Sequence, residues 1–411
     1  MKTYKTIIVL ALATALSGVC AQAFEVDEDT IVYGNLYFKI GENGGLVVVG
    51  CESNQETLII PPYVSYGGND YAVTEIGSHA ICNQFYLKRL ELPDALEKIG
   101  YYSICNNGLL DYLDIPSSVK SLGGSAFYYN CFKTLIIPDN IETIPSCLLD
   151  QENFEHDQLM HTLVLGRGVK SIGGSALGHI ENLKELYIMC PAPPAIAPDS
   201  YPFNHSRSGK AVVYVPAESL PLYDKRPAED RDYQYNGKYG FGKYDGTWAF
   251  FYDYRPIPDL FVVINEEEFT LTTGYEPQRI IFDTVNYAGV DVYSERWEYD
   301  SERVSIVNDS ISGLIDGETE IKRVVETSTG TYESRAVKVK VGDYDPSGVA
   351  LPTVDWTENP VQDSKNQNGN ALTAVRFYSI DGRTAGNDAS RLSPGVYIEL
   401  RAGKACKFVK K

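Results

Sequence analysis

The chain has 411 residues, 44% of them hydrophobic and 22% charged, which excludes a disordered chain and allows two or three buried cores. Acidic residues number 55 against 36 Lys and Arg, and the formal net charge of −19 repels phosphate, so DNA and RNA are excluded as expected partners. Thirty tyrosines against three tryptophans and three methionines favour β-strands, because Tyr suits a half-exposed strand face.

Residues 1–23 have the pattern of a secretory signal peptide. Two lysines precede an apolar segment at 7–16, and a site of the A-x-A type, which signal peptidase accepts, ends at Ala23. The pattern predicts an exported protein, either secreted or held at the cell surface or outer membrane. Cys20 opens an alternative, a lipid tether to a membrane, although Val19 stands where a lipobox usually has Gly, Ala or Ser.

One pattern recurs between residues 57 and 216: LxxLxLP, a short gap, VxxIG, and then a small residue followed by an aromatic or apolar one. From each of the first four copies of the second leucine, apolar residues follow at +6 and +9. This constancy predicts a mainly β fold, a leucine-rich repeat solenoid of about seven coils whose parallel strands stack roughly 4.8 Å apart. The second leucines, at separations of 23, 22, 28 and 23 residues, are Leu90, Leu113, Leu135, Leu163 and Leu186.

The best-formed copy, Leu110 to Phe127 with AFYYNC at 126–131, resembles the BspA-like leucine-rich repeat family and its unit LxxIxIPxxVxxIGxxAFxxC. Members of that family are exported proteins of Bacteroides-type and other host-associated bacteria. The resemblance covers roughly residues 55–220. It implies binding and adhesion at an exposed surface, usually to unknown ligands, and no catalysis.

Seven cysteines remain after the predicted cleavage, so they cannot all pair within one chain. No CxxC is present, and neither a metal nor another cofactor is expected. Cys82 and Cys105 each follow an equivalent repeat isoleucine by six residues and are expected to be neighbours. We expect buried thiols that fill the core, although a Cα separation near about 5 Å would also allow a disulfide.

Three local motifs suggest catalysis or metal binding, but each lacks a residue or a spacing that its signature requires. GGS at 123–125 and at 173–175 begins like the G-x-S-x-G turn of a nucleophilic serine, yet both copies lack the final glycine, and their return at equivalent positions favours a structural corner. His156 and His161 are five residues apart and do not match the HExxH zinc signature. GKYGFGK at 237–243 has Walker spacing, but a tyrosine replaces the Ser or Thr that would meet magnesium. We therefore expect no enzyme.

Side chains beside the repeat leucines are expected on the outer face of the strand sheet, charged in the early coils and apolar or aromatic later, and such a row often marks a contact site. The aromatic segment 217–259 is either a cap of the last coil or a platform for sugars or peptides. It can also fold back over the row. The ligand-binding candidates from both places are Tyr112, Ile136, Val164, Tyr187, Tyr214, Tyr239, Tyr244 and Trp248.

Residues 260–343 change to short alternating strands with polar turns, as in a two-sheet sandwich. The order of Trp297, VSIV at 304–307 and a closing VKVKV resembles bacterial Ig-like domains, which implies a spacer or adhesion unit. A polar linker follows at 344–370.

The tail is expected to form three strands. YSIDGR at 378–383 and SPGVYIEL at 393–400 resemble the C-terminal sorting domains of the type IX secretion route, which implies a role in export. The expected division is therefore a signal peptide at 1–23, an N-terminal cap at 24–56, leucine-rich repeats at 57–216, an aromatic cap or insertion at 217–259, an Ig-like domain at 260–343, a linker at 344–370 and a sorting-like β domain at 371–411.

Together these features predict an exported protein whose repeats bind a protein or glycan of the host or of other cells. The alternative is a structural or assembly component of the cell envelope without a soluble ligand. A third class, a glycan-active enzyme, needs paired carboxylates in a cleft, and no motif supplies them.

Overall fold

The computed structural model divides the chain into two compact units, residues 1–342 and 343–411. Its regular structure is almost entirely β-strand, as predicted; the helices among the described residues are a 3-10 helix, Ala217–Ser219, and the short helix α1, Leu220–Tyr223. The described residues are 7–9, 24–27, 29–52, 55–149, 159–178, 180, 182–196, 202–203, 211–223, 251, 253–342, 376–379, 384–386, 395–401 and 404–410.

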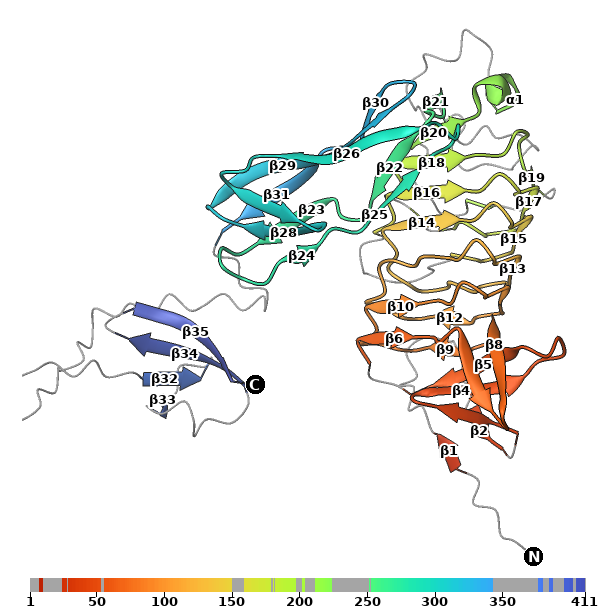
Figure 1. Ribbon diagram of the computed structural model, residues 1–411, viewed down its shortest axis with the longest axis horizontal. Coiled ribbons are helices and arrows are strands. Elements are labelled where there is room, and N and C mark those ends of the chain that lie inside the picture. Colours follow the sequence, from red (N-terminus) through yellow and green to blue (C-terminus); the bar gives the residue numbers. More distant parts are fainter. Residues whose placement is uncertain are drawn as a thin grey trace, which may run out of the picture. The chain divides into compact units, whose positions relative to one another are not determined.

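An N-terminal cap precedes the repeats (Figure 1). Its strands are β2 (Phe24–Val26), β3 (Ile31–Tyr33), β4 (Leu36–Ile40), β5 (Leu46–Cys51), β7 (Tyr63–Tyr66) and β8 (Asn69–Ile76). β1 (Ile7–Val9) pairs with β2 and belongs to the predicted signal peptide. Strands β3, β4 and β5 are antiparallel neighbours, and β5 then pairs in parallel with β8, which continues into the coils. Hydrogen-bonded strands thus cover the first coil, whose edge would otherwise be open.

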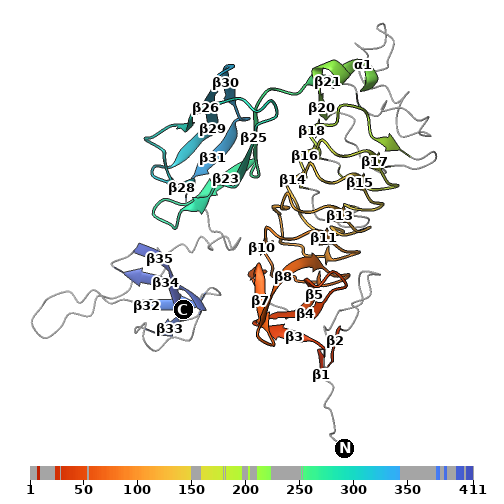
Figure 2. The same ribbon diagram turned by 45° about the vertical axis from the view of Figure 1, so that its right-hand side comes forward.

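Repeat leucines lie in two groups of parallel strands, one of two strands and one of five, which we together call the leucine sheet (Figure 2). Its strands are β6 (Thr57–Ile59), β10 (Arg89–Glu91), β14 (Thr134–Ile137), β16 (Thr162–Leu165), β18 (Glu185–Ile188), β20 (Val212–Val215) and β21 (Asp253–Pro256). Leu113, in the coil between the two groups, lies outside any strand. The register places Leu135, Leu163 and Leu186 side by side in successive coils, each at most 1% exposed. β21 belongs to the segment 217–259 and pairs in parallel with β20, so this part of the segment extends the sheet.

Short strands on the other sides complete each coil. They are β9 (Ile81–Cys82), β11 (Lys98–Ile99), β12 (Ile104–Cys105), β13 (Ser121–Leu122), β15 (Thr143–Ile144), β17 (Ser171–Ile172) and β19 (Ala195–Ile196). The serines of the two GGS copies lie at the corners between them, Ser125 with φ 54° and Ser175 with φ 51°. A Cβ on Gly123 would lie 2.4 Å from backbone atoms of the preceding coil, so only glycine fits there. Both GGS copies are therefore corners of coils.

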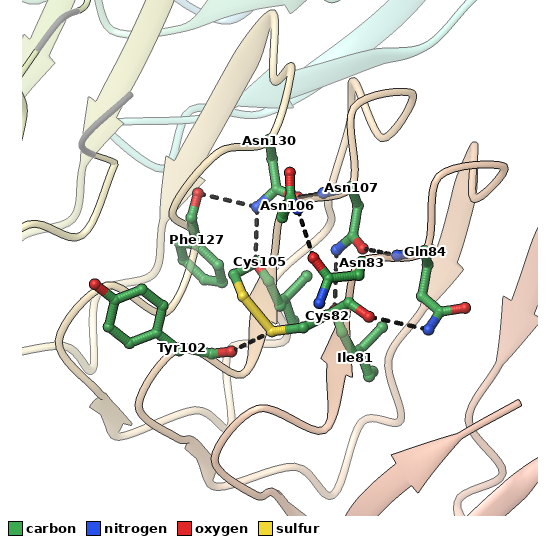
Figure 3. Close-up of a disulfide and its surroundings, with 11 residues drawn as sticks. Ile81, Cys82, Asn83, Gln84, Tyr102, Cys105, Asn106, Asn107, Phe127 and Asn130 are labelled. Atoms are coloured by element: carbon green, nitrogen blue, oxygen red, sulfur yellow. Dashed lines mark hydrogen bonds between the residues drawn. A yellow bond between two sulfur atoms is a disulfide. The ribbon is translucent and has the colours of Figure 1, made fainter. Parts of the chain in front are cut away.

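Cys82 and Cys105 form a disulfide, so the expectation of free thiols is wrong (Figure 3). Because β9 and β12 are parallel neighbours, the two cysteines are directly opposite each other with their Cα atoms 4.6 Å apart, a separation that a disulfide spans. Beside the disulfide, the side chains of Asn107 and Asn130 each donate to a backbone carbonyl of the preceding coil, at 3.0 and 2.7 Å. Covalent and hydrogen bonds therefore tie the early coils together.

Residues 257–342 form a second β-structure, which we call the β-domain. Its strands are β22 (Phe261–Ile264), β23 (Glu268–Leu271), β24 (Gln278–Arg279), β25 (Phe282–Val285), β26 (Val292–Tyr299), β27 (Val304–Val307), β28 (Ser310–Gly313), β29 (Gly317–Thr327), β30 (Thr331–Glu333) and β31 (Val337–Val341). They form the sheets β23-β31-β29-β26, β24-β28-β27 and β22-β25, which share one apolar core. The alternation is clear in β31, whose three valines are buried and whose two lysines are exposed.

The described residues of the second unit form one antiparallel sheet, in the order β33-β32-β34-β35. This is one strand more than the sequence predicts, because the short β33 pairs with the edge of β32. The strands are β32 (Arg376–Ser379), β33 (Thr384–Gly386), β34 (Gly395–Arg401) and β35 (Lys404–Lys410).

Candidate functional site

The structure brings the later binding candidates together on the outer face of the leucine sheet. The register pairs each with the next across four successive strands. We call these residues the outer row: Ile136, Val164, Tyr187 and Tyr214. Tyr112 lies in the preceding coil, and the remaining three candidates, which fall outside the described residues, are Tyr239, Tyr244 and Trp248.

The outer row is covered by strands β22 and β25 of the β-domain. Val164 is 0% exposed and Tyr187 only 6%. The ring of Tyr187 stacks on that of Phe261 with centroids 4.0 Å apart, and on that of Tyr214 at 4.5 Å. Val263 completes the apolar cluster from the β-domain side. For Val164 and Tyr187 the expectation of a solvent-facing surface is therefore wrong, because these apolar side chains lie against a strand pair roughly 100 residues further along the chain.

A column of basic side chains lines one side of this junction. Each lies two residues before an anchor leucine, so three successive coils carry a basic residue at the equivalent position. They contact three consecutive residues of the turn after β22, at 265–267. The pairs are Lys133 with Glu266, His161 with Asn265, and Lys184 with Glu267. This column was not predicted from the sequence, although basic residues recur two positions before Leu135, Leu163 and Leu186.

His161 is the centre of the column and is 2% exposed. Its Nε2 lies 2.8 Å from the carbonyl oxygen of Asn265, which only accepts, so Nε2 carries the proton and Nδ1 accepts from the Thr162 hydroxyl at 2.9 Å. The guanidinium of Arg335 is 3.3 Å from the same Nε2 and donates to the carbonyl of Ile264 at 2.8 Å. Burial first, and then the Arg335 charge, lower the pKa of His161 to about 4. At neutral pH the imidazole is therefore uncharged.

The junction also contains a partly buried carboxyl group, that of Asp283 on β25. The Tyr112 hydroxyl donates to both oxygens of Asp283 at 3.3 Å. Burial, with the nearby Asp114 carboxylate as a second cause, raises the pKa of Asp283 to about 6. Tyr112 is thus a contact between the two domains.

The described residues offer little to catalysis or metal chemistry. Within them, no group of three or more His, Cys, Asp or Glu is placed to hold a metal ion. Burial raises the pKa of the Cys51 and Cys190 thiols to about 12, which keeps both protonated and unreactive at neutral pH. Over the same described part of the chain, no helix has the length and apolarity to cross a membrane.

Comparison with known proteins identifies the repeats. Residues 74–192 match, in six copies, the family described as the BspA type leucine rich repeat region. The match confirms the resemblance that the motif indicated over the central coils.

Solved structures of other leucine-rich repeat proteins are also similar to the chain. A leucine-rich repeat protein of T. pallidum is 18% identical over 38% of this chain and 70% of its own, with a TM-score of 0.33. One from Bacteroides ovatus is 21% identical over 45% of this chain and 55% of its own, with a TM-score of 0.24. A leucine rich cell surface protein of Faecalibacterium prausnitzii is 11% identical over 47% of this chain and 90% of its own, with a TM-score of 0.17. No curated protein sequence is significantly similar to the chain.

Proposed function

We propose that the protein is an exported, non-enzymatic binding protein whose BspA-type repeats engage a protein or glycan ligand outside the cell, as a surface-held or secreted molecule. The observation that carries the proposal is the repeat motif at 74–192, which builds a long sheet and contributes no catalytic motif. The signal-peptide pattern at 1–23 supports export.

Within the leucine sheet, the strands free to meet a ligand are the early ones. β6 and β10 precede the coils that contact the β-domain, and Ile59 of β6 is 58% exposed. Arg89 and Glu91 of β10 lie beside it on the same face. An apolar residue flanked by charges is a common composition for a contact surface. We therefore assign ligand contact to β6 and β10. The outer row instead belongs to the junction with the β-domain.

A glycan and matrix-protein array probed with the full chain tests this assignment. We expect reproducible binding that Ile59→Asp weakens at least tenfold. Val307→Asp is the matched control, since Val307 is 64% exposed on β27 of the β-domain, and it should leave binding unchanged. If Ile59→Asp binds like the unmodified chain, β6 is not the contact surface.

The alternative function is a structural or assembly component of the envelope. The observation in its favour is that the chain itself covers the outer row, which leaves less of the sheet for a soluble ligand. Absence of binding on the array, together with retention of the chain in envelope fractions, would select this alternative.

We propose that the β-domain is an Ig-like spacer and that the second unit is a sorting-like domain. The shared core of the β-domain sheets supports the first, and the antiparallel sheet at 376–410 supports the second. A chain ending at residue 370 tests the sorting role: we expect it to accumulate inside the outer membrane, and normal export would contradict that role.

A further inference from the structure

The junction between the leucine sheet and the β-domain contains a histidine that lies against a permanent cation. His161 belongs to the repeats and Arg335 to the β-domain, and their nitrogens are 3.3 Å apart. In its neutral form His161 donates to the carbonyl of Asn265, so it bonds directly to the β-domain. A second proton on this imidazole would place two cations side by side in a buried interface, where water screens them poorly.

We propose that this pair is an acid-sensitive latch: protonation of His161 releases the β-domain from the leucine sheet and exposes the outer row. This proposal does not depend on the proposed ligand, since it concerns only the contacts at the junction. Release leaves both domains folded, since each has its own apolar core. Release would expose to water the apolar cluster between the two domains, which includes Val164, Tyr187 and Phe261.

The charges around His161 act in both directions. Arg335 and Lys184 oppose a proton on the ring, and Glu267 favours one. Glu185 lies beside Thr162, whose hydroxyl oxygen is 3.3 Å from the Glu185 carboxylate. The charged groups that face the ring are Lys133, Lys184 and Glu185 from the repeats, and Glu266, Glu267 and Arg335 from the β-domain. Each of Lys133 and Lys184 forms an ion pair with its own glutamate, whereas the hydrogen bonds of Arg335 go to backbone carbonyls, and its guanidinium lies 3.3 Å from His161 Nε2.

The sign of the pH effect follows from the direction of the shift. The pKa of His161 is lower in the docked state than its usual value of 6.5, so docking is fully stable above that value and weakens as the pH falls towards 4. By linkage, the docking equilibrium falls about tenfold at pH 5.5 and on the order of 100-fold at pH 4.5. Asp283 has the opposite effect on docking, because acid neutralises its partly buried carboxylate and so favours the docked state. The Asp283→Asn variant removes this opposing effect and serves as the background.

Two methionines of the chain report on opening and on unfolding separately. Met189 is 7% exposed in the junction cluster, whereas Met160 is 1% exposed in the core of the coils. Peroxide oxidises a thioether without ionising it, so the intrinsic rate changes little with pH. The rate of sulfoxide formation at each site, followed by mass spectrometry on the full chain, therefore measures release at Met189 and unfolding of the repeats at Met160.

In the Asp283→Asn background we expect Met189 oxidation to rise about tenfold from pH 7.5 to 5.5 and further at 4.5, while Met160 stays protected. His161→Gln keeps a donor for the Asn265 carbonyl but takes up no proton, and it should reduce the rise to less than about twofold. The matched control is His79→Gln. His79 lies at a corner of a coil, so this variant should keep the full rise in Met189 oxidation.

Any of three results overturns the latch. The first is Met189 protection that is unchanged down to pH 4.5. The second is an equal acid response in the His161→Gln and His79→Gln chains. The third is oxidation of Met160 in step with Met189, which would mean that acid unfolds the repeats as a whole.

Discussion

At the scale of single residues, the junction is set by ionisable groups that lie in an apolar interface. Asp283 accepts from Tyr112 but has no cation within ion-pair distance among the described residues, so its charge is poorly compensated. His161 is uncharged at neutral pH and therefore carries no uncompensated charge in the interface. Asp283 was not a sequence-level candidate, and His161 was weighed only with His156 as a zinc motif and rejected, because a single Asp or His in a strand pattern carries no signal of its environment.

Replacing Asp283 with asparagine should stabilise the chain at neutral pH. The pKa of Asp283 is raised from 3.8 to about 6, so the ionised carboxylate costs stability fully above pH 6 and not at all below about pH 4. Allowing for partial solvent screening, we expect Asp283→Asn to raise the free energy of unfolding by about 1–2 kcal/mol at pH 7.5 and to leave it unchanged at pH 4. Urea unfolding at the two pH values measures this. Asp29→Asn, at an exposed position in the cap, is the control, and an equal gain from both variants would refute the argument.

At the scale of elements, the coils are held in register by contacts between equivalent positions. Cys82 and Cys105 are 23 residues apart, one coil length, and lie opposite each other because β9 and β12 pair without an offset. That spacing predicted that they are neighbours. The expectation of free thiols was wrong, since a disulfide depends on whether two side chains turn toward each other within a pair of strands.

Removing the disulfide should destabilise the repeats. Closing a loop of 23 residues is worth about 3 kcal/mol through the entropy of the unfolded chain. We expect the double variant Cys82→Ala, Cys105→Ala to lose about 2–4 kcal/mol in chemical denaturation. Dithiothreitol should lower the stability of the unmodified chain by a similar amount and leave the double variant unaffected. A reductant effect of the same size on both chains would show that the disulfide contributes nothing.

At the scale of the whole first unit, the repeats and the β-domain are joined by an apolar cluster with a polar rim. The outer row supplies one side, and β22 and β25 supply the other. At the edge, Arg167 lies over the ring of Tyr287 at 4.5 Å and donates to its backbone carbonyl. An interface of this kind couples the two cores, so we expect them to unfold together.

Truncating Tyr187 should uncouple the two domains. Its ring stacks between Phe261 and Tyr214, and losing a buried aromatic side chain costs about 2–4 kcal/mol. In calorimetry we expect one transition for residues 24–342 in the unmodified chain and two in Tyr187→Ala. Tyr293→Ala, at a tyrosine that is 70% exposed on β26, should keep the single transition. Two transitions in the unmodified chain would contradict the coupling.

The sequence by itself determined what depends on neighbours one coil apart: the leucine anchors, the outer row, and the GGS corners where Gly123 passes close to the coil before it. Those features recur every 22 to 28 residues, so a periodic pattern reveals them. Only the tertiary structure decided what the outer row faces. His161 meets residues 104 and 174 positions further along the chain, and no local period connects segments that far apart. The burial, the hydrogen-bond partners and the pKa shifts at the junction all depend on those long-range contacts.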